Sequence, residues 1–114
     1  MQGDNTLHSL VKSLYGVSTT PLINGTVAAI GVAAIVVAPL NPRRVGLTIT
    51  NNSLNWIRIL PDPGVSAVNG IYVAPGGGSV TFRWDIDFEL IGLPWYGIAG
   101  GAASAVTIIE NIAY

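Results

Sequence analysis

The sequence predicts an all-β protein: an antiparallel β-sandwich, or a jelly-roll-like barrel, of about eight short strands. Glycine and proline contribute 14 and 7 of the 114 residues, which favours closely spaced turns over long helices. Apolar and β-branched segments alternate with turn signals roughly every eight to twelve residues, as in sandwiches and barrels. No helical crossover is expected after Gly16, which argues against a parallel α/β fold.

The N-terminal residues differ from the rest because their apolar positions recur at helical spacing: Leu7, Leu10, Val11 and Leu14. They predict a short amphipathic helix that ends at Gly16, followed by a linker over 17–25 rich in Ser, Thr, Pro and Gly. We therefore expect a helix and linker arm over 1–25 and a β-sandwich domain over 26–114. Two interpretations stay open: the helix packs on its own domain, or it docks on a neighbouring subunit and its four apolar residues form the interface.

In the first half of the domain, strands are expected over 26–30, 32–38, 45–50 and 56–60. Gly31 separates the first two as a hairpin or a bulge. The turn 39–42 leads into the third strand, where Val45, Leu47 and Ile49 alternate with small or polar residues, as in a half-buried strand. The polar turn Asn51–Asn55 leads into the fourth.

Later strands are expected over 71–74, 80–90, 95–99 and 105–112. Residues 80–90 show the clearest pattern, an unbroken alternation that places Phe82 and Trp84 on one apolar face, toward the core. A strand of that length would span roughly 36 Å, longer than most. We therefore expect a bend or bulge near Asp85–Asp87.

Charge is scarce, and this limits the classes of partner. Charged residues make up 10% of the chain, against about 25% in typical domains, and the net charge is −1. There is no basic patch for nucleic acid, and the longest apolar stretch, Val27–Leu40, falls short of the roughly 20 residues that a membrane helix needs. We expect neither a nucleic-acid nor a membrane partner, but a surface that associates with other proteins.

No pattern predicts catalytic, cofactor-binding or metal-binding residues. The single histidine, His8, lies beside Ser9 rather than one helical turn away. The carboxylates of Asp85, Asp87 and Glu89 would stand about 6.6 Å apart along a strand, too far for all three to converge on one cation without help. We expect a polar outer face, and the alternative is a cation held at an interface with another subunit. With no lysine after it, the run Gly76–Ser79 is expected to be a hairpin turn and not a phosphate-binding loop. The sequence therefore favours a non-enzymatic protein without cofactors.

Two residue pairs are candidates for contact with a partner. Arg43 and Arg44 form either a solvated turn or an ion-pairing site for an acidic patch on a partner. Trp95 and Tyr96 are expected in an intersubunit or core contact, and the alternative is a platform on which sugars stack.

The chain also resembles a family of small structural proteins through its turn and strand signatures. These are Asn41-Pro42-Arg43-Arg44, the run from Leu47 to Ser53, Asn69-Gly70-Ile71, Pro75-Gly76-Gly77, Phe82, Trp84 and Pro94-Trp95-Tyr96. Over residues 26–112 they resemble the β-sandwich head proteins of tailed bacteriophage virions, some of which decorate or cement the capsid. The resemblance carries over no functional residue.

This resemblance implies a capsid decoration or cement protein on the virion surface, assembled in the cytoplasm of the host bacterium. Its partners would be the major capsid protein and further copies of itself, with a trimer as one possible homo-oligomer. Two alternatives remain open: a glycan-binding module of the virion surface, and a minor head-tail or tail component.

Overall fold

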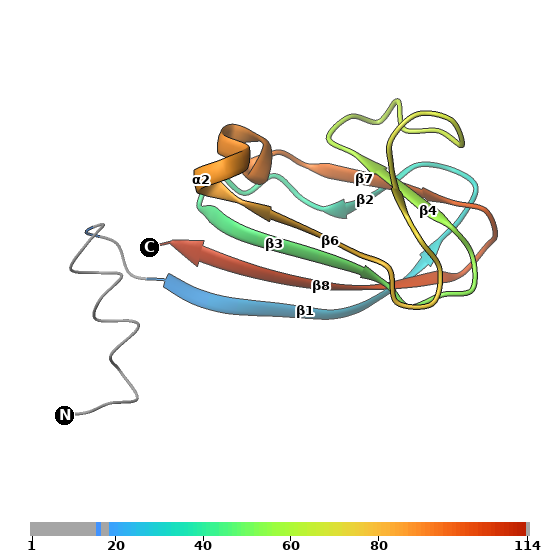
Figure 1. Ribbon diagram of the computed structural model, residues 1–114, viewed down its shortest axis with the longest axis horizontal. Helices are drawn as coiled ribbons and strands as arrows, with labels where there is room; N and C mark the ends of the chain where they lie inside the picture. Colours follow the sequence, from blue (N-terminus) through green and yellow to red (C-terminus); the bar gives the residue numbers. More distant parts are fainter. Residues whose placement is uncertain (1–15, 17–18, 114) are drawn as a thin grey trace.

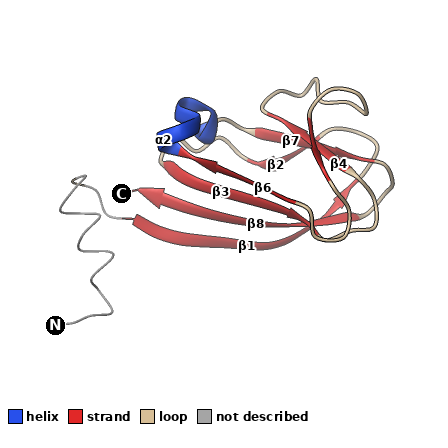
Figure 2. Cartoon of the chain, in the orientation of Figure 1, coloured by secondary structure: helices blue, strands red, loops and turns tan. Residues whose placement is uncertain are grey.

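The computed structural model describes residue 16 and residues 19–113, and the chain forms two four-stranded antiparallel sheets that face one another (Figure 1). The strands are β1 (Thr19–Ile30), β2 (Ile35–Ala38), β3 (Arg44–Asn51), β4 (Ile57–Leu60), β5 (Ile71–Val73), β6 (Ser79–Arg83), β7 (Trp95–Ala99) and β8 (Ser104–Ala113). One helical segment follows β6 and comprises α2 (Trp84–Asp87) and the 3-10 turn η2 (Phe88–Gly92) (Figure 2).

The strand order identifies the sandwich as a jelly roll. One sheet has the order β1-β8-β3-β6 and the other β2-β7-β4-β5. The pairs β1–β8, β2–β7, β3–β6 and β4–β5 are nested, as if one long antiparallel hairpin had been wrapped over both sheets. The predicted antiparallel sandwich of about eight strands, including its jelly-roll form, is confirmed.

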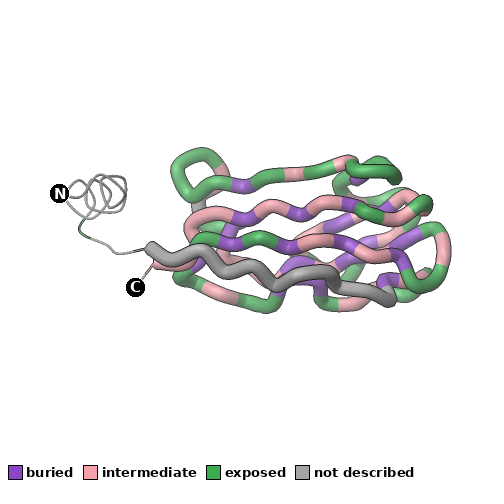
Figure 3. Tube along the Cα trace, turned by 90° about the horizontal axis from the view of Figure 1, so that it is seen from below, coloured by how far each residue is buried: buried purple, intermediate pink, exposed green. Residues whose placement is uncertain are grey.

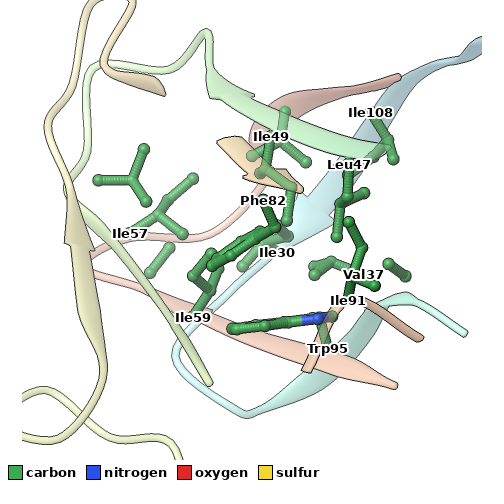
Figure 4. Packing of buried hydrophobic residues seen from close by; sticks show 14 residues of the cluster. Ile30, Val37, Leu47, Ile49, Ile57, Ile59, Phe82, Ile91, Trp95 and Ile108 are labelled. Atoms are coloured by element: carbon green, nitrogen blue, oxygen red, sulfur yellow. The ribbon is translucent and has the colours of Figure 1, made fainter. Parts of the chain in front are cut away.

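Alternation along the strands fills the space between the sheets. Buried positions alternate with half-buried and exposed ones along the strands (Figure 3). In β3, Leu47 and Ile49 are buried, whereas Thr48 and Thr50 face outward, as their spacing predicts. Phe82 from β6 crosses the gap and stacks on Trp95 from β7 with ring centroids 4.4 Å apart (Figure 4). Isoleucines of both sheets surround this pair: Ile30, Ile49, Ile57, Ile59 and Ile108.

The boundary of the sandwich lies earlier than predicted. Strand β1 begins at Thr19, so most of the expected linker is strand, paired with β8 from Thr19 opposite Ala113 onward. Pro21 was one reason to predict a linker here, but an edge strand such as β1 tolerates a proline. The turn at Gly31 is also not a hairpin, because β1 and β2 belong to different sheets. The predicted N-terminal helix lies outside the described residues and stays a prediction.

Residues 80–90 depart most from the expected strand. Strand β6 ends at Arg83, and the chain turns into α2 and η2. The Asp87 carboxylate accepts a hydrogen bond of 2.7 Å from the Arg83 backbone N–H, while Asp85 forms a 2.7 Å ion pair with the Arg83 side chain. These local contacts replace further strand pairing. Phe82 is buried as predicted, but the prediction for Trp84 is wrong: its side chain is 48% exposed.

Candidate interaction surfaces

Arg44 is an internal residue of this fold and not a contact for an acidic partner. Its side chain is buried, and its Nε donates to the Glu110 carboxylate of β8. Its Nη1 donates to the carbonyls of Ile91 and Leu93 at 2.9 and 3.2 Å, and its Nη2 to that of Pro39 at 2.6 Å. The guanidinium therefore ties β3 to β8, to the end of η2 and to the turn before β3.

Arg43 remains available to a partner. Its side chain is exposed, whereas its backbone is held: the N–H donates to Asn41 Oδ1 at 3.0 Å, and the carbonyl accepts from the Ala113 N–H at 2.8 Å. The two adjacent arginines thus separate into one structural and one exposed side chain. Sequence reasoning missed the role of Arg44 because its carboxylate partner is 66 positions away in the chain.

Trp95 and Tyr96 also separate. Trp95 is 1% exposed, stacks on Phe82, and donates from Nε1 to the Leu90 carbonyl at 3.1 Å. It is a core residue, so it is available neither to a partner surface nor to a sugar-stacking platform. Tyr96 points to the opposite side of β7 and is half-buried on the outer face of its sheet.

The outer face of the β2-β7-β4-β5 sheet is almost wholly apolar, and we call it the aromatic face. It consists of Val36, Arg58, Leu60, Tyr72, Tyr96 and Ile98. Tyr96 lies opposite both Val36 and Leu60, forming one row across the sheet. A second row places Arg58 opposite both Ile98 and Tyr72.

The single charge on the aromatic face is held within the chain. The Arg58 guanidinium lies 5.4 Å from the centroid of the Tyr72 ring and donates to the Gly70 carbonyl at 2.9 Å. Val36 and Tyr72 remain 47% and 53% exposed beside it. A sheet face with this composition matches the core of a protein–protein interface better than a solvated surface.

The opposite sheet presents a hydroxyl-rich outer face over β3, β6 and β8. Thr48 and Thr81 are hydrogen-bonded across the strands at 3.1 Å, and Thr50 donates to Ser79 at 3.3 Å. Side chains of this kind are satisfied by one another and by water. The two outer faces thus differ in character, and the apolar one is the candidate for burial against another protein.

A third surface lies at the end of the sandwich that carries α2 and the C-terminal end of β8 (Figure 1). A groove of about 540 Å³, here called the end groove, opens between the turn before β3, the start of β3, and the α2–η2 segment. Its apolar lining comprises Leu40, Pro42, Val45, Trp84, Ile91 and Leu93, and its polar lining includes Arg44 and Glu89. Leu40 is 63% exposed, so the apolar lining reaches the surface.

The remaining candidate residues belong to the N-terminal segment. Leu7, His8, Leu10, Val11 and Leu14 lie outside the described residues. Within the described part of the chain, no three side chains of the metal-ligating types are grouped closely enough to hold an ion. Nor does that part contain a helix long and apolar enough to cross a membrane.

Comparison with known proteins gives a likeness of fold. No family model matches the sequence, and no curated protein matches it. A chain from the solved structure of Bacillus endospore appendages, described as a novel family of disulfide-linked pili, matches with a TM-score of 0.50 and 16% sequence identity. The match covers 86% of this chain and 87% of that chain. At this identity the likeness extends to the jelly-roll sandwich and no further.

Proposed function

We propose that this chain is a non-enzymatic structural subunit that packs through its aromatic face against copies of itself and against a larger protein shell. The observation that carries the proposal is the face itself: six outward side chains whose only charge is already bound within the chain. Solvent exposure of such a face is unfavourable, and covering it recovers the apolar area.

The size of the face favours a repetitive assembly over a tight dimer. Four short strands spaced about 4.8 Å apart make a patch roughly 19 Å wide, with a planar area of only a few hundred Å². A standard stable interface buries about 800 Å² on each partner. Each contact through this face is therefore weak, and many simultaneous contacts supply the affinity, as happens in a shell or a fibre.

The specific form that we propose is a decoration or cement protein of a tailed-bacteriophage head. It rests on the resemblance of residues 26–112 to such proteins and on the scarce charge of the chain. The partners are then the major capsid protein and neighbouring copies, including a trimeric arrangement, and the exposed Arg43 is suited to an acidic patch on the shell. The alternative form, a minor head-tail or tail component, would pack against its neighbours through the same surfaces.

A fibre subunit is the second candidate. It is favoured by the likeness in fold to a chain from disulfide-linked pili. Because the 114 residues contain no cysteine, disulfide links between these residues cannot hold such a fibre together, and apolar contacts must do so. A glycan-binding module is less well supported, since Trp95 lies in the core.

The test places one charge on each outer face. Ile98→Lys introduces a second cation beside Arg58 on the aromatic face, and the matched control Thr50→Lys introduces one on the hydroxyl-rich face. Both positions are half-buried and point outward from a central strand. Sedimentation velocity and electron microscopy of the full chain should show concentration-dependent association for wild type and Thr50→Lys, and its loss in Ile98→Lys.

Two results would contradict the proposal. One is a wild-type chain that stays monomeric at high concentration and does not bind purified heads lacking it. The other is equal loss of association in both lysine variants while circular dichroism shows that both are folded.

A further inference from the structure

We propose that the end groove is the binding site for residues 7–14 of the same chain, which bind it as an amphipathic helix. This interaction is independent of the proposed function, because it concerns the isolated subunit.

The sequence of the segment matches a known mode of recognition. Leu7, Leu10, Val11 and Leu14 occupy positions i, i+3, i+4 and i+7, the anchors by which a helix lies in an apolar groove. Gly16, which the structure does describe, has a φ of 73°, the left-handed conformation that commonly ends a helix. A helix ending at this glycine presents all four apolar residues on one side.

The groove offers a matching surface. Its lining is mostly apolar, and Trp84 and Leu40 at its mouth are 48% and 63% exposed. Ile86 and Leu90 lie on the same helical segment as Trp84 and are 61% and 46% exposed, which extends the apolar surface beyond the groove. Eight helical residues extend about 12 Å, which suits a groove of this volume.

The path of the chain brings the segment to its own groove. Thr19 pairs with Ala113, whose N–H donates to the Arg43 carbonyl at 2.8 Å. The start of β1 is therefore separated only by β8 from the start of β3, which lines the groove. Two strand spacings amount to about 10 Å, and residues 15–18 can extend to about 14 Å. A connection this short gives an effective concentration in the millimolar range, which favours the groove of the same chain over that of another copy.

The polar side of the segment faces away from the groove. With 3.6 residues per turn, Ser9 and Lys12 each lie about 150° around the helix from the centre of the four apolar positions. The Lys12 ammonium therefore stays in solvent, and the apolar anchors alone bind the groove.

Absence of cysteine from the sequence makes a direct test simple. Val11 lies on the apolar side of the helix, and cysteine is a small apolar replacement for it. In the double variant Val11→Cys/Glu89→Cys, oxidation should form an intrachain disulfide, seen as a faster-migrating monomer on non-reducing gels and lost on reduction. The matched control Val11→Cys/Thr50→Cys, with its second cysteine on the hydroxyl-rich face, should not cross-link within the chain. Interchain dimers and ladders from dilute Val11→Cys/Glu89→Cys would instead place the segment on another copy and overturn the proposal.

A second measurement does not depend on the position of one cysteine. Leu10→Asp should release the segment, so that tryptophan emission shifts to longer wavelength and acrylamide quenches it more strongly. The control Ser9→Asp places the same charge on the opposite side of the helix and should leave both signals unchanged.

The exposed groove tryptophan must be the reporter. In a chain that carries Trp84→Phe, adding Leu10→Asp should therefore change neither the emission wavelength nor the acrylamide quenching. Equal emission and quenching in Leu10→Asp and Ser9→Asp would show that the end groove does not hold this segment. Loss of association in Ile98→Lys, by contrast, bears only on the proposed function.

Discussion

Replacing Arg44 with methionine should be among the most destabilising single changes in this protein. The arginine is 2% exposed and its partner Glu110 is 3% exposed. In Arg44→Met, the carboxylate is left buried without its cation, and the carbonyls of Pro39, Ile91 and Leu93 lose their donors.

The magnitude follows from these losses. Removing one partner of a buried ion pair costs about 3–5 kcal/mol. Each carbonyl that stays dry and unpaired adds about 1–3 kcal/mol, although water can reach those in the surface turn. The low end of these ranges taken together, about 4 kcal/mol, corresponds to a melting temperature lowered by roughly 16 °C for a domain of this size. Urea unfolding followed by circular dichroism measures the free energy directly.

A double-mutant cycle separates the ion pair from the other contacts. Glu110→Leu alone should be nearly as damaging as Arg44→Met, since it leaves the guanidinium buried without its counter-ion. Arg44→Met/Glu110→Leu should be more stable than either single variant, because it removes both charges. Its free energy of unfolding should still be about 1–3 kcal/mol lower than that of wild type, since the three carbonyls remain without the arginine donors.

The reasoning would be refuted by single variants that each lose less than about 1 kcal/mol, the range typical of exposed ion pairs. It would also be refuted if the losses in the double variant were simply additive, because the two charges would then not depend on each other.

Two further changes test the assignment of faces and of backbone strain. Phe82→Ala should lower the free energy of unfolding by about 3–5 kcal/mol, because it truncates a buried side chain. The neighbouring Thr81→Ala, on the outer face, should change it little. Equal melting temperatures of the two variants would mean that the faces of β6 are assigned wrongly. Gly70→Ala should be destabilising by about 1–3 kcal/mol, because Gly70 has a φ of 141° and an added Cβ would lie 3.0 Å from the Ile59 carbonyl oxygen. Gly31→Ala, with its nearest contact at 3.9 Å, is the control in the same thermal melts, and equal stability of the two glycine variants would contradict the strain at Gly70.

Local alternation predicted most of the sheet. The strands expected over 45–50, 56–60, 95–99 and 105–112 are all found within a residue or two, since a period of two residues is visible in any short window. Beyond Arg83 the same period predicted strand where the chain is helical. There, two carboxylates bind Arg83 and end the strand, so Trp84 moves from the predicted core to the surface.

Candidate surfaces were harder to predict because they depend on which strands become neighbours. The aromatic face combines Tyr96 with Val36, Leu60 and Tyr72, which come from three other strands and are adjacent only through the sheet register. Of the predicted contact residues that the structure describes, only Tyr96 lies on that face. The end groove likewise depends on α2, a segment that the alternating pattern predicted to be strand.

The nested strand pairing also sets the order in which the chain can fold at least entropic cost. Ten residues separate β4 from β5, whereas 73 separate β1 from β8. Closing the longer loop directly costs about 1.8 kcal/mol more in chain entropy than closing the shorter one. If the pairs form from the inside outward, each new pair has only a short stretch left to close, so the hairpin over 57–73 is the favoured nucleus. The outermost strands are then the last to join, and the first to separate when the subunit is stressed.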